Sequence, residues 1–214
     1  MKKIILTVCL LCMIMCACAF AACGGNGSGG GVETYVFEAE YTDLTDVQGG
    51  GHSNEASGVG MIYGNGTEED LARGWSSGYF VAFTHKEGVK ITFEFESSEA
   101  VNGAVIVLRV GSEMGKLTFN SSSFEVKLNG TAIDYGNMTV ENSPVLDDMK
   151  FYDKTLTANA SLLKGKNELT LTVLANELSG GTTAGPIIDC VKVSTKAKLS
   201  WTPLTDNPSK RGEI

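Results

Sequence analysis

The sequence predicts an all-β fold, an antiparallel β-sandwich with very little helix. Apolar and polar residues alternate with period two in several segments, as they do in strands that have one buried face. Turns containing glycine or asparagine separate these segments, and a single short segment carries the signals of a helix. At least seven strands with hairpin turns between them are typical of a sandwich.

Three segments show the alternation most clearly. Residues 89–96 place an apolar side chain at every second position, and Phe124–Leu128 and Leu169–Val173 follow the same pattern. Asn129-Gly130 comes directly after the second of these segments. Because both residues accept a positive φ, they predict a tight primed turn that closes a hairpin.

Two other segments are apolar almost throughout, which predicts central strands covered on both sides. They are Ala104–Val110 and Ile187–Val193. The helix candidate is Thr67–Arg73, because Thr67 is a good N-cap and acidic residues follow it in the first turn.

The N-terminus resembles a bacterial lipoprotein signal. Two lysines precede an apolar stretch, Ile4–Met15, that is too short to span a bilayer, so an export signal over residues 1–22 is expected. Phe20–Cys23 resembles a lipobox, which predicts that Cys23 carries a lipid and anchors the chain to a bacterial membrane, facing outward. Residues 23–31 are a glycine-rich tether. An ordinary signal peptide cut nearby is the alternative.

Residues 32–193 are expected to form one domain, followed by a tail at 194–214. The tail either folds back onto the sandwich through Trp201 and Leu204 or leads to a further module. Cys190 is the only cysteine of the body and lies in an apolar stretch, so a buried, inert thiol is expected. Loss of the two lysines of the signal would change the net charge from −8 to −10. This charge argues against nucleic acid as a partner and favours a divalent cation.

The order of several motifs resembles carbohydrate-binding modules of families six and thirty-five, which have a galactose-binding-like jelly-roll sandwich. The motifs are Tyr35–Glu40, Gly58–Gly60, Leu108–Val110, Phe124–Gly130, Leu162–Asn167 and Ile188–Val191. The resemblance covers about residues 35–193. It implies non-catalytic binding of an oligo- or polysaccharide.

Acidic residues at the two ends of this region predict a calcium site. Glu38 and Glu40 would point to the same face of a strand, and Asp189 would come from a last strand that pairs with the first. Loop carbonyls from Gly49 to Gly58 would complete the oxygen ligands that calcium prefers. In the families that the chain resembles, the matching positions hold a structural calcium. The alternative is a solvated acidic face.

Sugar recognition needs aromatic rings on end loops, together with polar groups for the hydroxyls. Trp75 lies in a polar, glycine-flanked loop and is the leading candidate. Tyr79, Tyr152 and Asn176 match positions that the resembling families use for ligands. Other roles stay open: Trp75 could plug the loop, and Tyr79 could belong to the core. Arg109 would either support the site or pair with an acid.

Ile187 is a departure from that pattern, because some relatives carry a ligand-binding polar residue there.

No catalytic constellation can be assembled from the sequence. Gly51–Glu55 lacks the second glycine of a nucleophile elbow, and His52 and His85 have no third nitrogen or sulfur ligand for a catalytic zinc. Adjacent acids such as Asp147-Asp148 are typical of solvated surface. We therefore expect a monomeric, lipid-anchored, calcium-containing sandwich that binds carbohydrate and is not an enzyme. An envelope protein that binds a protein partner is the alternative. An aliphatic patch would favour that alternative, and an acid pair across a cleft would favour an enzyme.

Overall fold

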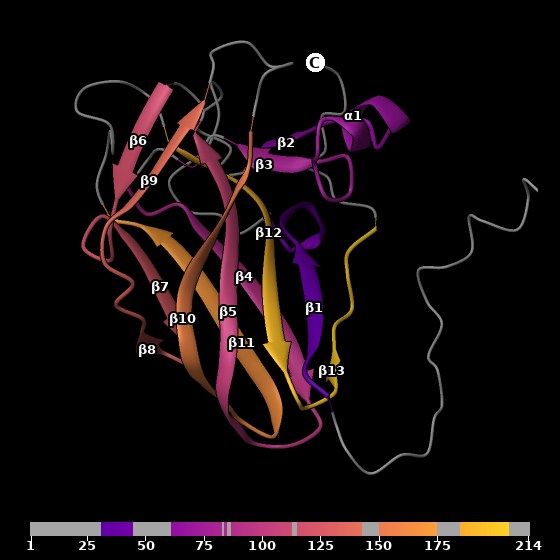
Figure 1. Ribbon diagram of the computed structural model, residues 1–214, viewed down its shortest axis with the longest axis vertical. Coiled ribbons are helices and arrows are strands. Elements are labelled where there is room, and N and C mark those ends of the chain that lie inside the picture. Colours follow the sequence, from indigo (N-terminus) through magenta and orange to yellow (C-terminus); the bar gives the residue numbers. More distant parts are fainter. Residues whose placement is uncertain are drawn as a thin grey trace, which may run out of the picture. The chain divides into compact units, whose positions relative to one another are not determined.

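The computed structural model describes residues 31–44, 61–82, 84, 87–112, 115–142, 150–174 and 185–205 (Figure 1). The chain divides between Gly30 and Gly31, and all of these residues belong to the second part. They form two antiparallel sheets that face one another, as the sequence predicts. No helix among the described residues is both long enough and apolar enough to cross a membrane.

The first sheet has six strands and contains both ends of the predicted calcium site. In order across the sheet they are β10 (Tyr152–Leu162), β5 (Val101–Ser112), β12 (Pro186–Thr195), β3 (Phe80–Ala82) and β2 (Met61–Tyr63), and β1 (Glu33–Glu38) also pairs with β12. β12 pairs with β3 at Ile188 and with β1 from Cys190 onward. The predicted pairing of the first strand with a late strand is therefore confirmed.

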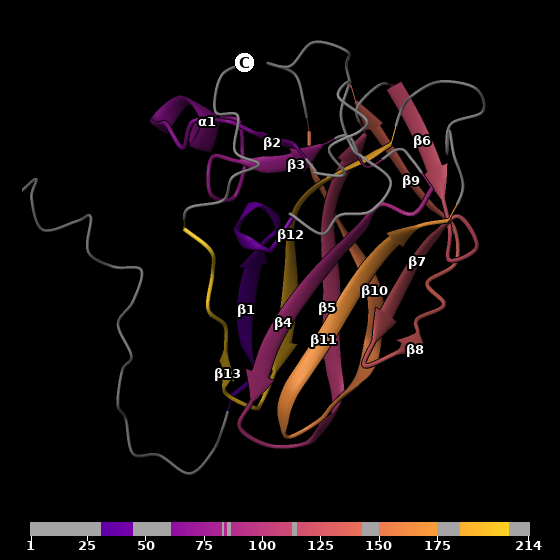
Figure 2. The ribbon, with the colours of Figure 1, turned by 180° about the vertical axis from the view of Figure 1, so that it is seen from behind.

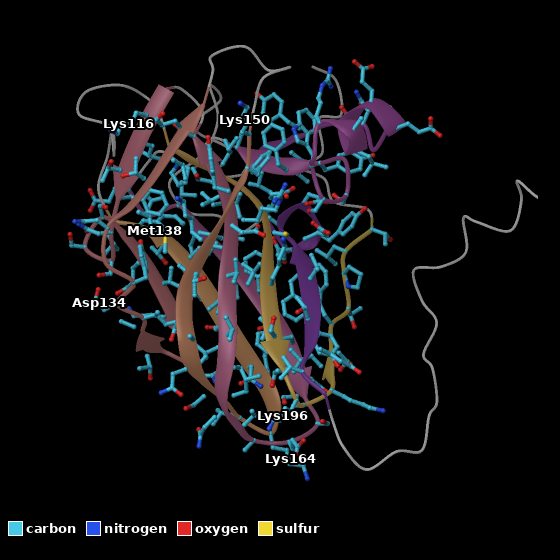
Figure 3. All side chains as sticks on the ribbon, in the orientation of Figure 1. Lys116, Asp134, Met138, Lys150, Lys164 and Lys196 are labelled. Carbon is cyan, nitrogen blue, oxygen red and sulfur yellow. The ribbon has the colours of Figure 1, made fainter. Side chains whose placement is uncertain are left out.

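The second sheet, seen in front in Figure 2, has five strands. They are β13 (Leu199–Ser200), β4 (Lys90–Ser97), β11 (Gly165–Val173), β7 (Phe124–Leu128) and β8 (Thr131–Ala132), in that order across the sheet. β6 (Gly115–Phe119) and β9 (Met138–Asn142) form a separate ribbon, and the helical elements are η1 (Ala39–Tyr41) and α1 (Glu68–Ala72). Lys116 and Lys150 lie near one end of the sandwich, whereas Lys164 and Lys196 lie near the other (Figure 3).

Side chains that point inward from both sheets form the main core. Phe93 and Leu169 come from the second sheet, and Ile106 and Leu108 come from the first, and all four are fully buried. Each alternates with a polar or half-exposed neighbour along its strand, which is the period-two pattern of the sequence. The fold therefore depends on apolar burial between the sheets, and Cys190 is a free, buried thiol as predicted.

Local predictions are confirmed at the turn and at the helix. Asn129 and Gly130 have φ values of 52° and 77°, as a primed hairpin turn requires. Thr67 caps α1, and its side chain and that of Asp70 exchange hydrogen bonds with the backbone in a capping box.

The prediction that Ala104–Val110 is covered on both sides is wrong. Val105 and Val107 are partly exposed, because the outer face of β5 carries no second layer at these positions. The corresponding prediction for β12 is correct over its first six residues, which are all buried. A small second cluster covers the outer face of β12 there.

Candidate functional site

The three predicted calcium ligands lie near one another, two on the first sheet and one in the 3-10 helix that follows β1. Glu38 ends β1, and Asp189 is the bulge residue of β12, where the register against β5 shifts between Ile188 and Cys190. Glu40 does not share a strand with Glu38, because the chain turns into the 3-10 helix η1 at Ala39. The expectation of two carboxylates on one strand face is therefore wrong, although Glu40 and Glu38 do interact electrostatically.

The bulge explains the place of Asp189. Cys190 is paired with Arg109 of β5, and the extra residue sends the Asp189 carboxylate toward the same guanidinium. Arg109 Nε lies 2.6 Å from Asp189 Oδ2, and the backbone N–H of Ser76 donates to Asp189 Oδ1 at 3.1 Å. Asp189 is fully buried, so these partners compensate a charge that would otherwise be costly.

Arg109 joins three separate segments. Besides Asp189, its guanidinium donates to Asp153 Oδ1 at 3.3 Å and to the Gly74 carbonyl at 2.7 Å. Lys192 Nζ also lies 2.8 Å from Asp153 Oδ2. Of the two roles expected for Arg109, the structure thus shows acid pairing, and this pairing holds the loop around Gly74 against the outer face of the sheet.

The pKa values of the acids are displaced upward. Burial raises the pKa of Glu38 to about 7, and the charge of Asp189 adds to this effect. Burial raises the pKa of Glu40 to about 8, and the charge of Glu38 contributes. Burial also raises the pKa of Asp189, although Ser76 and Arg109 oppose the shift. A nearby cation would stabilise the ionised forms of these three carboxylates and so oppose the upward shifts of their pKa values.

The donor set fits a cation in part. Ser76 Oγ donates to Glu38 Oε2 at 2.5 Å and Ser77 Oγ donates to Glu40 Oε1, so both acids already have hydroxyl partners. Among the described residues, no group of three or more His, Cys, Asp or Glu side chains has the spacing of a metal site. The expected carbonyl ligands of Gly49–Gly58 lie outside the described residues.

Trp75 is buried, with 1% of its surface exposed, so the prediction of an exposed sugar platform is wrong. Its indole packs edge-on against Phe80 at 4.9 Å and belongs to the small outer cluster with Ala82 and Ile187. The Arg73 guanidinium lies 5.4 Å from the indole centroid. The alternative, that Trp75 plugs its loop, agrees with this packing.

The polar composition of the Trp75 loop has an internal cause. Ser76 donates to the half-buried Glu38 and Ser77 to the buried Glu40, and the positive φ values of Gly74 and Gly78, 86° and 80°, let the chain bend around the indole. A loop rich in serine and glycine therefore buries its tryptophan because its polar groups find partners within the protein.

Tyr79 and Tyr152 are half-buried and pack against the main core. Tyr79 lies over Gly66, where an added Cβ would be 2.8 Å from the ring. The Tyr152 hydroxyl donates to the Glu141 carbonyl at 3.0 Å. Asn176 and Cys23 lie outside the described residues. The residues predicted for sugar binding are therefore engaged in packing and hydrogen bonds wherever the structure describes them.

The tail contributes a site that the sequence analysis did not identify. After β13 the chain folds back beside β1 (Figure 1), as the first alternative for the tail expected. Trp201 is half-buried, packs edge-on against Phe37 at 5.4 Å and contacts the main core. The backbone N–H of Leu204 donates to the Tyr41 carbonyl at 2.8 Å, which fixes the segment.

Two hollows, of about 430 Å³ and about 420 Å³, flank this tryptophan. Both are lined by Glu94, Trp201 and Thr202, so we treat them together as the Trp201 groove. The first hollow is also lined by residues of β4, β11 and β13, namely Phe95, Glu96, Lys166 and Ser200. The second is also lined by residues of η1 and the segment after it, of β4 and of the tail, namely Tyr41, Thr42, Asp43, Thr92 and Leu204. Each volume falls within the range of small-molecule sites. The signal in the sequence was Trp201 itself, a large aromatic residue in a polar tail.

No family model matches the chain, and no curated protein matches it. Among solved structures, it is similar to a family 35 carbohydrate-binding module from Cellvibrio japonicus, with 13% identity, a TM-score of 0.47, and coverage of 80% of this chain and 99% of the module. A family 35 module from Clostridium thermocellum has 12% identity and a TM-score of 0.47, with 75% of this chain and 98% of that one covered. The resemblance expected from the motifs thus also appears among solved structures.

Proposed function

We propose that this protein binds carbohydrate without catalysis, and that the Trp201 groove holds the sugar. The observation that carries the proposal is a half-exposed tryptophan, held rigidly against Phe37, between two hollows lined by carboxylates and hydroxyls. An aromatic face suits the C–H face of a pyranose, and carboxylates and hydroxyls can accept its O–H groups. The groove therefore combines the two kinds of group that sugar binding requires.

The arrangement of the acids favours binding over hydrolysis. Glu94 and Glu96 both come from β4 and lie on the same wall, whereas the third acid of the groove, Asp43, comes from the segment after η1. Glycoside hydrolysis needs two carboxyl groups that flank the scissile bond from different sides. Glu94, the acid that shares a hollow with Asp43, already forms an ion pair with Lys166, whose Nζ lies 2.7 Å from its Oε1.

The alternative of an envelope protein with a protein partner receives less support. Among the residues that the structure describes, the exposed large apolar side chains come from β1 and the residue before it, α1, the β10–β11 turn, the end of β11 and the tail: Val32, Val36, Leu71, Leu163, Leu174 and Leu204. Such a distribution over five segments is ordinary for a protein surface.

A structural calcium is part of the proposal. Glu38 and Glu40, with Asp189 behind them, would hold the ion at the edge of the first sheet. The support is electrostatic: burial and mutual repulsion raise the pKa values of both glutamates, and a divalent cation would relieve this. The ion would stabilise the end of β1 and would have a structural role.

The lipid anchor at Cys23 is likewise proposed. A groove of this kind binds a single sugar chain weakly, and many copies anchored on one surface would raise the overall avidity. Palmitate labelling of cells that express the chain tests the anchor. A wild-type chain that takes up no label, or a Cys23→Ala chain that still does, would make the protein a secreted module.

The central experiment is a glycan array probed with the full chain in detergent and calcium. Binding should weaken about tenfold or more in Trp201→Ala and less in Trp201→Phe, which keeps an aromatic face. Tyr152→Phe is the matched control, because it removes one hydroxyl at the site predicted from the sequence. Binding lost in Tyr152→Phe and kept in Trp201→Ala would return the site to the end loops.

A further inference from the structure

The Trp201 groove has the dimensions of an extended site. Its two hollows share one wall at Glu94 and one aromatic ring at Trp201. A ligand that occupies both must pass the indole, so the groove suits a chain of at least two sugar rings better than a compact metabolite.

The ring of Trp201 is held before any ligand arrives. It packs edge-on against Phe37 of the first sheet, and Phe95 of the second sheet lines the same hollow. β13 pairs with β4 on one side of the tryptophan, and the Leu204–Tyr41 hydrogen bond fixes the other side. A ligand therefore loses little affinity to ordering of the protein.

The charge of the lining is strongly one-sided. Asp43, Glu94 and Glu96 are acidic, and Lys166 is the only base among the lining residues that the structure describes. Lys166 Nζ lies 2.7 Å from Glu94 Oε1, so its charge is already committed within the groove. Glu168 stands opposite Glu94 in the β4–β11 register and adds further negative charge beside it.

We propose that the Trp201 groove selects saccharides that carry protonated amino groups, and that it disfavours uronic acids. The inference rests on the proposed function and names its substrate class. A protonated amine can form charge-assisted hydrogen bonds with the carboxylates, and it is also attracted to the face of an indole. A uronic acid would place its carboxylate in a lining that contains three acids and one base, which costs affinity.

The test compares three oligosaccharides of equal length: glucosamine, N-acetylglucosamine and galacturonate oligomers, each titrated against the full chain in detergent by calorimetry. The glucosamine oligomer should bind about tenfold more tightly than its acetylated counterpart, and this advantage should shrink as salt is raised. Equal affinity for the two, or tighter binding of galacturonate, would overturn the inference and leave carbohydrate binding intact. If none of the three binds, the inference fails, and the glycan array decides whether the groove binds another carbohydrate.

Matched variants separate the groove from the general negative charge of the protein. Glu94→Gln with Glu96→Gln should abolish most of the preference for the amine, so that the glucosamine and N-acetylglucosamine oligomers bind with similar affinity. Glu125→Gln is the control, since Glu125 forms a similar pair with Lys127 in β7, 2.7 Å apart, outside the groove. A preference that survives the double substitution, or that Glu125→Gln lowers equally, would contradict the assignment.

Discussion

The two tryptophans of the chain both lie in polar segments but differ in burial: Trp75 is buried and Trp201 is half-buried. Trp75 belongs to a loop of glycines and serines, yet only 1% of its surface is exposed. Trp201 belongs to the polar tail, yet its ring is fixed against Phe37 and still lines an open groove. Each local context suggests exposure, and only the second tryptophan is accessible to a ligand.

The difference comes from what the polar neighbours of each tryptophan contact. Beside Trp75, the Ser76 N–H donates to the buried Asp189 and the Ser77 hydroxyl to the buried Glu40, and Arg109 binds the Gly74 carbonyl, so the loop closes onto the sheet. Beside Trp201, the acid of the neighbouring strand, Glu94, is about half exposed. A polar loop can therefore be part of a protein interior when its partners are buried, and the following predictions test this contrast.

The largest effect is expected at Trp75. Removal of its indole in Trp75→Ala should lower the free energy of unfolding by about 3–5 kcal/mol, because it empties the small outer cluster. Urea denaturation measures the loss. Trp75→Phe should cost clearly less, since it keeps an aromatic ring and removes an indole N–H that has no hydrogen-bond partner among the described residues. A nearly unchanged stability of Trp75→Ala would mean that the loop is open in solution.

Arg109→Ala should have the next largest effect, about 2–3 kcal/mol. The substitution leaves the Asp189 carboxylate buried without its cation and frees the Gly74 carbonyl, although partial exposure of Arg109 reduces the cost. The double variant Arg109→Ala, Asp189→Asn should recover part of the loss in urea denaturation. No recovery would show that Arg109 stabilises the loop by contacts other than this ion pair.

A pH dependence should follow from the raised pKa values of Glu38 and Glu40. In the folded protein they are about 7 and about 8, whereas in the unfolded chain both acids titrate near their ordinary range. The folded state therefore binds more protons between about pH 5 and pH 8, so stability falls as the pH rises through this window. In chelator, the melting temperature should drop by roughly 5 °C from pH 5 to pH 8.5.

Calcium should oppose this loss, because it binds the ionised carboxylates and therefore stabilises most at high pH. The double variant Glu38→Gln, Glu40→Gln should show neither the pH dependence nor the response to calcium. A melting temperature that rises with pH in chelator would contradict the raised pKa values, and an unchanged midpoint on adding calcium at pH 8 would remove the metal from the proposal.

The smallest effect on stability is expected in the open region. Glu94→Gln removes an exposed ion pair with Lys166 and should change the free energy of unfolding by less than about 0.5 kcal/mol. Its effect should appear in ligand affinity instead. A large loss of stability would show that Glu94 supports the fold, which would make it unsuitable as evidence for a ligand site.

Most of the fold could be predicted from the sequence, and less of the site. The alternation in residues 89–96 identified β4, and Asn129-Gly130 identified the turn between β7 and β8, because both depend on interactions within a few residues. Glu38 and Asp189 could be predicted as site residues because they are acidic, but no local sequence pattern predicts the bulge that turns Asp189 toward Arg109. The groove could not be predicted from the sequence, because its walls come from segments that are far apart in the chain: η1, β4, β11 and the tail.

The sequence by itself therefore determined β4, β7 and β11 with their inward faces, the primed turn and the capped helix, since local sterics and periodic burial decide these. The tertiary structure alone decided which outward residues are covered. Ser76 meets Asp189 across 113 residues of chain, and this contact helps to bury Trp75. Trp201 stays accessible because it follows β13, the edge strand of the second sheet, and packing against Phe37 covers only part of the ring.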